Sequence, residues 1–204
     1  MSLVNNFYLI GTFILSVLSL HLVGKYFIKK NILDRVNSRS SHTSIATRSG
    51  GLSVFIVVFI SASYYYLNSI TLFDYSLIIP IGLLLMVGLY DDVYQLDFKL
   101  KFVFQVIAAK LIIDNGLIIE NLHGIFGIFE LNRIIGQVLT IFVIVSIINA
   151  FNFIDGIDGL AILIFILFLL LYEFYSNNLT SLSELSKILI VTLIPNLYYN
   201  YRLN

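Results

Sequence analysis

The stretch FYLIGTFILSVLSLHLVGKY, residues Phe7 to Tyr26, decides the fold class of this chain. As an α-helix, this stretch would be about as long as the hydrocarbon core of a bilayer is thick, and it has no charged residue before Lys25. It lacks the basic leader and the small-residue cleavage pattern that mark a removable signal peptide. We therefore predict a retained transmembrane helix.

The rest of the chain has the same character. Of its 204 residues, 59% are hydrophobic and 12% are charged. The mean hydropathy of +0.95 exceeds what a soluble domain needs to fill one core. Further apolar runs follow at about 52–67, 75–90, 102–119, 134–153, 160–175 and 188–199. We predict an all-α, polytopic transmembrane helix bundle of about seven spans, forming a single integral membrane domain over residues 1–204.

Lysine and arginine are unevenly distributed along the chain. Nine of the 12 follow the first, third and seventh apolar runs: Lys25, Lys29, Lys30, Arg35, Arg39, Arg48, Lys99, Lys101 and Arg202. The loops after the second, fourth and sixth runs hold only Arg133 and Lys187. By the positive-inside rule, we predict that the N-terminus is outside and that the odd-numbered spans end in the cytoplasm.

Three polar segments interrupt the apolar runs, and the predicted topology puts all three at the cytoplasmic face. They read DRVNSRSSHTSIATRSGG (34–51), YDDVYQLDFKLKFVFQ (90–105) and NAFNFIDGIDGLA (149–161). Burying charge in hydrocarbon is costly, so acidic residues at span ends need water, a cation or a partner. The convergence of the three polar segments on one face predicts a shared site.

In the second segment, Asp91 and Asp92 directly follow an apolar run. Adjacent carboxylates repel each other unless a cation or a shared proton relieves them, and a divalent metal would do so. The alternative is that one aspartate caps the next helix while Lys99 and Lys101 are ordinary interfacial anchors.

In the third segment, Asp155 and Asp158 are three residues apart, and Asn149 and Asn152 repeat that spacing upstream. On a helix this spacing places the four side chains on one face. Such oxygen ligands suit Mg²⁺, which binds through one or two carboxylates and substrate phosphates. The alternative is a cytoplasmic turn, in which Asn, Asp and Gly are favoured for backbone reasons.

The first segment supplies the opposite charge through Arg39, His42 and Arg48. Guanidinium groups and backbone amides can hold an anionic group, and phosphate is the natural candidate. The alternative is a basic juxtamembrane loop that only sets topology or attracts anionic lipid.

These segments resemble those of the polyprenyl-phosphate N-acetylhexosamine-1-phosphate transferases, which start peptidoglycan lipid, teichoic acid and O-antigen synthesis. The matching text is RSSHTSIATRSGG, DDVYQLDFKLKFVFQ and NAFNFIDGIDGLA, in the family's order and spacing. The resemblance implies transfer of a phospho-N-acetylhexosamine from a UDP-sugar to polyprenyl (undecaprenyl) phosphate, with release of UMP and a requirement for Mg²⁺. It also implies the first membrane step of cell-wall or surface polysaccharide synthesis, including lipopolysaccharide, at the cytoplasmic face of the bacterial inner membrane.

The resemblance assigns roles residue by residue. It implies that Asp91 and Asp92 are the catalytic aspartates and that Asn152 and Asp155 bind the metal. It implies substrate-binding roles for Arg39, His42, Arg48, Lys101, Asn149, Asp158 and Asn200. The expected partners are the polyprenyl phosphate lipid and the UDP-N-acetylhexosamine, not nucleic acid, and a homodimer is compatible with this reading.

Family members continue beyond the segment resembling LIPNLYYNYRLN with a Gly-Asp metal motif and a loop rich in His and Arg. Because this sequence stops at Asn204, we expect it to be the N-terminal two-thirds of the family's catalytic domain. Two other classes stay open. One is an inactive or split fragment, or a non-catalytic membrane subunit. The other is a transporter or channel that uses intramembrane carboxylates as an ion relay.

Overall fold

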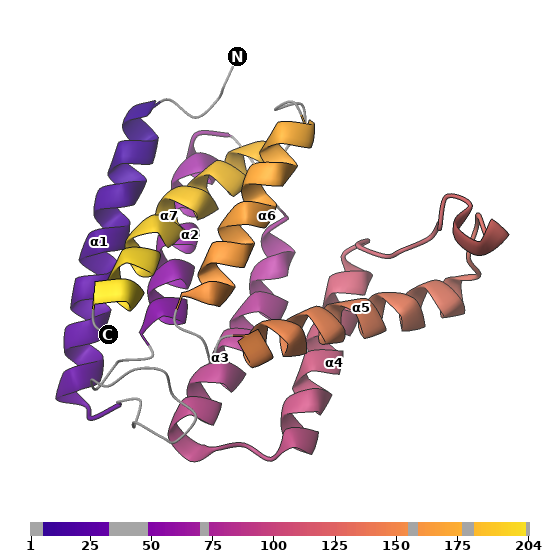
Figure 1. The fold of residues 1–204 in the computed structure, drawn as a ribbon, viewed down its shortest axis with the longest axis horizontal. Helices are drawn as coiled ribbons and strands as arrows, with labels where there is room; N and C mark the ends of the chain where they lie inside the picture. The colour runs from indigo at the N-terminus through magenta and orange to yellow at the C-terminus, as the bar shows by residue number, and fades with distance from the viewer. Residues whose placement is uncertain (1–5, 33–48, 70–73, 155–158, 177–181, 203–204) are drawn as a thin grey trace. The chain divides into compact units, whose positions relative to one another are not determined.

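The computed structural model describes residues 6–32, 49–69, 74–154, 159–176 and 182–202 (Figure 1). Within these ranges seven α-helices and no β-strand are found, which confirms the all-α prediction. The chain divides into two compact units. One contains α1 (Asn6–Lys29), α2 (Gly50–Leu67), α6 (Leu160–Ser176) and α7 (Leu182–Arg202). The other contains α3 (Ile78–Tyr94), α4 (Phe98–Asp114) and α5 (Arg133–Ile154).

Four helical segments in the described part of the chain are long and apolar enough to cross a membrane: Phe7–Lys29, Gly50–Leu67, Tyr75–Tyr94 and Arg133–Ile154. Helix α6 is also apolar but has only 17 residues. The protein is therefore a multi-pass membrane protein, as the sequence predicts. The count of about seven spans and the orientation of the N-terminus stay predictions.

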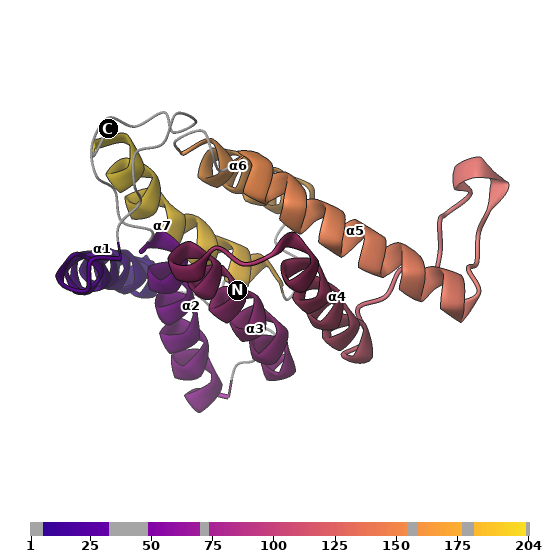
Figure 2. The ribbon, with the colours of Figure 1, turned by 90° about the horizontal axis from the view of Figure 1, so that it is seen from below.

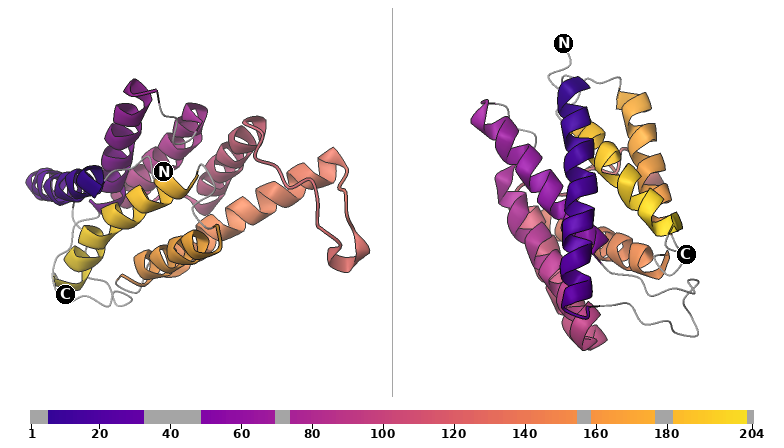
Figure 3. Two further views of the ribbon diagram at one scale, coloured as in Figure 1. Left: turned by 90° about the horizontal axis from the view of Figure 1, so that it is seen from above. Right: turned by 90° about the vertical axis from the view of Figure 1, so that its left-hand side faces the viewer.

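In the first unit, α7 packs against α1, α2 and α6, as the ribbon views show (Figures 1 and 3). Small hydroxyl side chains stand where these helices meet. The hydroxyl of Ser16 on α1 donates to the carbonyl of Thr192 on α7 over 2.9 Å, and the hydroxyl of Ser19 donates to the carbonyl of Ser53 on α2 over 3.3 Å. Small residues let membrane helices approach closely, so packing and these hydrogen bonds hold the unit together.

Helix α7 begins six residues before the apolar run predicted at 188–199. Its first turns contain Ser183 and Ser186, which are buried and donate hydrogen bonds to the carboxylate of Glu173 on α6. The apolar side chains of Ile166, Leu169 and Leu193 form a core cluster between α6 and α7. The sequence predicts a loop at these polar residues, but they are helical, because the carboxylate on α6 accepts hydrogen bonds from their hydroxyl groups.

In the second unit, α3 and α4 lie side by side and are joined by residues 95–97 (Figures 1 and 2). This connection is too short for anything but an antiparallel pair. The pair is fastened at both ends. The hydroxyl of Ser76 bonds the side chain of Asn115 at one end, and Lys101 pairs with Asp91 at the other.

The boundaries predicted for the fourth apolar run, 102–119, are wrong by four or five residues at each end. Helix α4 begins at Phe98, after Asp97 in an extended N-cap conformation, and ends at Asp114. Gly116 has φ of +87°, which breaks the helix before Leu117. The apolar residues that follow belong to the connection between α4 and α5.

Candidate active site

The C-terminal end of α3 is shaped around Asp91. Gln95 adopts a left-handed conformation (φ 52°), and its backbone N–H donates to the carbonyl of Asp91 over 2.9 Å, which ends the helix. The chain then turns so that the N–H of Leu96 donates to Oδ1 of Asp91 over 2.9 Å. One carboxylate oxygen of Asp91 is therefore fixed by the backbone of its own turn.

The other carboxylate oxygen of Asp91 faces Lys101 in the first turn of α4. Oδ2 of Asp91 lies 2.8 Å from Nζ of Lys101, and about a quarter of each side chain is exposed (25% and 26%). Partial desolvation strengthens such a charge-assisted hydrogen bond relative to one in open water. The site thus contains an ammonium group whose position is set by a carboxylate that the backbone orients.

Asp92 is the next residue in the same last turn of α3, and its side chain is half-buried. The capping alternative from the sequence is not what the structure shows, because Asp97 takes the N-cap position of α4. Lys101 is also more than an interfacial anchor, since it neutralises Asp91. The repulsion expected between the two adjacent carboxylates is reduced by a cation of the protein itself.

Gln105 lies one helical turn beyond Lys101 on α4 and is 2% exposed. Its carboxamide pairs with Asn149 on α5. Nδ2 of Asn149 donates to Oε1 of Gln105 over 2.8 Å, and Nε2 of Gln105 donates back to Oδ1 of Asn149 over 3.4 Å. Nδ2 of Asn149 also donates to the carbonyl of Val145 over 2.8 Å. We call Gln105 and Asn149 the carboxamide clasp.

The clasp joins the end of α5 to the helix that carries Lys101. The family resemblance predicts a substrate-binding role for Asn149 and none for Gln105, and the structure shows that the two side chains bond each other in the second unit. The spacing of four between Lys101 and Gln105 was the available signal, because it places both on one face of α4. Asn152, one turn after Asn149 on α5, is exposed.

The remaining predicted site residues are placed as follows. Asn200 lies on α7, in the first unit, and its side chain is exposed. Outside the described residues lie Arg39, His42, Arg48, Asp155 and Asp158. The convergence of all three polar segments therefore stays a prediction, whereas the structure pairs Asp91 with Lys101 and Gln105 with Asn149.

The donor set allows a test of whether Mg²⁺ suits this end of the second unit. Within the described ranges, no three acidic or imidazole side chains come together. Both oxygens of Asp91 are already bound, whereas the exposed side chain of Asn152 carries a carboxamide oxygen. Mg²⁺ characteristically takes few protein oxygens and keeps several waters, so an exposed carboxamide of this kind suits the ion.

Comparison with known proteins places the chain in a family. The model of Glycosyl transferase family 4 matches residues 74–203, which includes α3 to α7. Over 126 residues the chain is 32% identical to proteins of Salmonella typhi and Salmonella typhimurium named undecaprenyl-phosphate alpha-N-acetylglucosaminyl 1-phosphate transferase. That match covers 60% of this chain and 33% of each relative.

A Bacillus subtilis protein named probable undecaprenyl-phosphate N-acetylglucosaminyl 1-phosphate transferase is 30% identical over 116 residues, covering 53% of this chain and 31% of that protein. The chain thus spans about a third of the length of the curated relatives it matches. The family match covers more than half of the chain and contains both the Asp91–Lys101 pair and the carboxamide clasp. The chain belongs to glycosyl transferase family 4.

Proposed function

We propose that this protein transfers a phospho-N-acetylhexosamine from a UDP-sugar to polyprenyl phosphate in the membrane, and that UMP is the second product. The observation that carries the proposal is the Lys101–Asp91 pair at the edge of a membrane helix, within the stretch that matches the family. Two phosphorylated substrates repel each other. A fixed ammonium group beside a membrane-spanning helix is what their approach requires.

The reaction balances as a displacement at phosphorus. A phosphate oxygen of the polyprenyl phosphate attacks the β-phosphorus of the UDP-sugar, and the bond from that phosphorus to the bridging oxygen breaks. The bridging oxygen leaves with UMP, and the lipid keeps a diphosphate that carries the sugar. The acceptor phosphate reacts as an anion, so the step needs charge stabilisation and alignment more than proton removal.

In this proposal Lys101 binds a phosphate oxygen and offsets the charge that builds up as the phosphates approach. Asp91 is a positioning residue, because its carboxylate is held by Leu96 and in turn holds Lys101. Asp92 is the catalytic carboxylate beside it. The carboxamide clasp keeps the end of α5, with Asn152, attached to α4.

We further propose that Asn152 and Asp155 hold Mg²⁺ together with substrate phosphates. When bound, the ion would supply positive charge at the diphosphate and orient its oxygens. The proposed location is the bacterial inner membrane with the site at the cytoplasmic face, where nucleotide sugars are available. The product would begin a cell-wall or surface polysaccharide such as lipopolysaccharide.

The experiment uses the full chain, purified in detergent and returned to nanodiscs. It is mixed with undecaprenyl phosphate, UDP-N-acetylglucosamine and Mg²⁺, and UMP is measured by liquid chromatography. We expect UMP release that needs the lipid phosphate, and a loss of at least tenfold in Lys101→Gln. Lys110→Gln, at the other end of the same helix, is the matched control and should change little. UMP release without lipid acceptor, or none with it, contradicts the proposal.

A further inference from the structure

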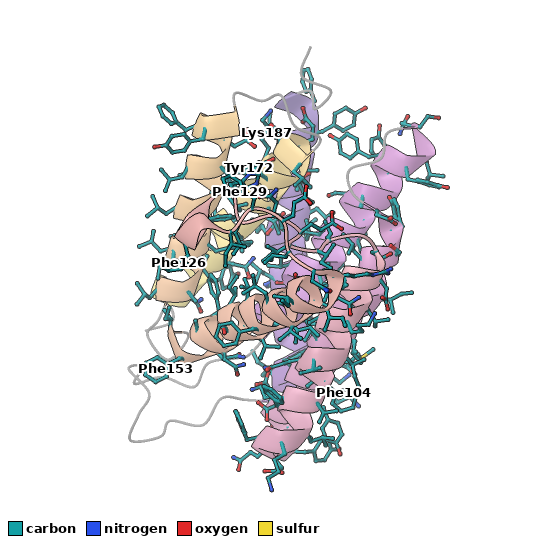
Figure 4. All side chains as sticks on the ribbon, turned by 90° about the vertical axis from the view of Figure 1, so that its right-hand side faces the viewer. Phe104, Phe126, Phe129, Phe153, Tyr172 and Lys187 are labelled. Atoms are coloured by element: carbon teal, nitrogen blue, oxygen red, sulfur yellow. The ribbon has the colours of Figure 1, made fainter. Side chains whose placement is uncertain are left out.

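The connection between α4 and α5, residues 117–132, ends in an apolar tip. We call this connection the finger. The exposed apolar side chains of its tip are Ile125, Phe126, Ile128 and Phe129. Phe126 is 95% exposed and Phe129 is 63% exposed, and both are labelled on the finger in Figure 4. The base of the finger carries Glu120, Asn121, Glu130 and Asn132.

An apolar tip above a polar base is the opposite of the distribution expected for a loop in water. Surface loops are commonly polar at the tip, because Ser, Asn, Asp and Gly satisfy both the turn and the solvent. Here two phenylalanines and two isoleucines stand farthest out, and the acidic groups stand at the base. A contiguous exposed apolar patch with a polar rim marks an interaction surface.

Many backbone N–H and C=O groups of the tip are hydrogen-bonded within the finger, as is needed in a segment that moves out of water. The N–H of Leu122 donates to the carbonyl of Phe129 over 2.8 Å, and the N–H of Gly124 donates to that of Ile128 over 3.0 Å. Turn bonds of 2.9 to 3.1 Å close the tip itself, with donors Ile125, Gly127 and Ile128. Lower down, the N–H of Leu131 donates to the carbonyl of Glu120 over 2.8 Å. These bonds lower the cost of moving the tip into a less polar medium.

The exposure of Phe126 is built into a strained turn. Its φ is +56°, in the left-handed region that a bulky side chain disfavours, and His123 has φ of +51°. Gly124 and Gly127 supply the other two positive φ values, +88° and +75°. The turn hydrogen bonds of the tip hold this conformation, and the conformation leaves the Phe126 ring 95% exposed.

The base of the finger is fixed to the first turns of α5. The N–H of Ile119 donates to the hydroxyl of Thr140 over 2.9 Å. Gly136 makes the approach possible, since a Cβ there would lie 2.6 Å from the carbonyl oxygen of Ile119. The tip stands to one side of the N-terminal end of α5, not farther along its axis (Figures 1 and 2). Helix α5 is long and apolar enough to cross a membrane and begins at Arg133, so a span made by α5 would place the membrane boundary at this end.

We propose that the tip of the finger inserts into the boundary between headgroups and acyl chains, with Phe126 and Phe129 as anchors that set the depth of α5. Aromatic side chains favour this layer, and the acidic base would stand among the headgroups. A second copy of the chain is a poorer occupant. Stable protein interfaces bury roughly 1,200 Å² or more in total, and four side chains at a loop tip do not supply that area.

The chain contains neither tryptophan nor cysteine, so one substitution gives a unique probe. The full chain with Phe126→Trp is placed in vesicles of phospholipids brominated on the acyl chain, with Glu120→Trp at the finger base as the matched control. We expect the indole at position 126 to be quenched at least threefold more by brominated lipid than the control, and less by aqueous iodide. Equal quenching of the two variants overturns the proposal.

A second variant separates lipid from protein contact. Phe126→Cys in the same vesicles, treated with a mild oxidant, should stay monomeric on a non-reducing gel. Efficient disulfide cross-linking between copies would overturn the proposal in favour of a contact between two chains. Both variants are first checked for a single monodisperse peak in size-exclusion chromatography. Neither readout depends on sugar transfer, so the outcome is independent of the proposed function.

Discussion

The ammonium nitrogen of Lys101 lies 2.8 Å from Oδ2 of Asp91, and this pair links the end of α3 to the start of α4. The same carboxylate accepts the N–H of Leu96 through its other oxygen. Asp91 is therefore bound on both sides before any substrate arrives. This geometry supports the positioning role proposed for Asp91.

The first prediction concerns the coupling between these two side chains. Asp91→Asn should reduce the rate of UMP release, and Lys101→Gln should reduce it by at least as much. If Asp91 acts through Lys101, the double variant should be no slower than Lys101→Gln alone, because both changes remove the same contribution. Steady-state rates of the unchanged protein, the two single variants and the double variant complete a double-mutant cycle. Rate losses that multiply would show that Asp91 has a role of its own.

The second prediction concerns Asp92. Asp92→Asn should lower the maximal rate at saturating substrates by tenfold or more. Asp91→Asn should cost about 1 kcal/mol of stability, because it removes a partly exposed ion pair with Lys101. Thermal denaturation in detergent and initial rates, measured on the same preparations, compare the two. A maximal rate of Asp92→Asn close to that of the unchanged protein would contradict the catalytic role proposed for Asp92.

The third prediction concerns the carboxamide clasp. Gln105→Leu removes a buried carboxamide and leaves Oδ1 of half-buried Asn149 without the Gln105 donor, which costs about 1–3 kcal/mol. The midpoint of thermal denaturation should fall by several degrees. Gln137→Leu, the same change at a half-buried position on α5, is the control and should shift it much less. Similar shifts in the two variants would mean that the clasp contributes nothing specific.

The fourth prediction concerns the close approach of the finger to α5. Gly136→Ala places a methyl group 2.6 Å from a backbone carbonyl, and overpacking of this kind costs roughly 1–3 kcal/mol. Gly88→Ala on α3 is the matched change, because no atom lies within 4 Å of the added carbon. It should be neutral, or stabilising by up to about 1 kcal/mol, since alanine favours helix over glycine. Denaturation midpoints that fall in the same way for both would refute the assignment.

The fifth prediction concerns magnesium. Asn152→Ala should raise the Mg²⁺ concentration at half-maximal rate about tenfold, because it removes one oxygen donor. Asn132→Ala, just before the other end of α5, should leave that concentration unchanged. Magnesium titrations of UMP release give both values. An unchanged requirement in Asn152→Ala would remove this residue from the metal site.

The sequence predicted the number and order of the helices in the described residues because apolar runs are the strongest signal in a membrane protein. It failed where local chemistry outweighed that signal. The apolar residues 117–119 read as helix, but Gly116 with its positive φ had already ended α4. Conversely, Ser183 and Ser186 read as loop, although Glu173 on a neighbouring helix satisfies them inside the bundle.

The candidate site shows a similar division. Asp91 and Lys101 could be nominated from the sequence because charges next to apolar runs stand out. Their direct pairing and the engagement of Asn149 by Gln105 could not, because both depend on how three helices pack. The residue type and helical position of Gln105 do not indicate which side chain it will contact. Its pairing with Asn149 becomes visible only in the tertiary structure.

The most direct test of the central claim follows the β-phosphate of the donor. The full chain in nanodiscs is given undecaprenyl phosphate, Mg²⁺ and UDP-N-acetylglucosamine radiolabelled on its β-phosphate, and the lipid and aqueous phases are then separated. Phospho-sugar transfer predicts that the label enters the lipid phase in the same amount as unlabelled UMP appears in water. Label that stays in the aqueous phase as UDP, with the sugar alone on the lipid, would contradict the account.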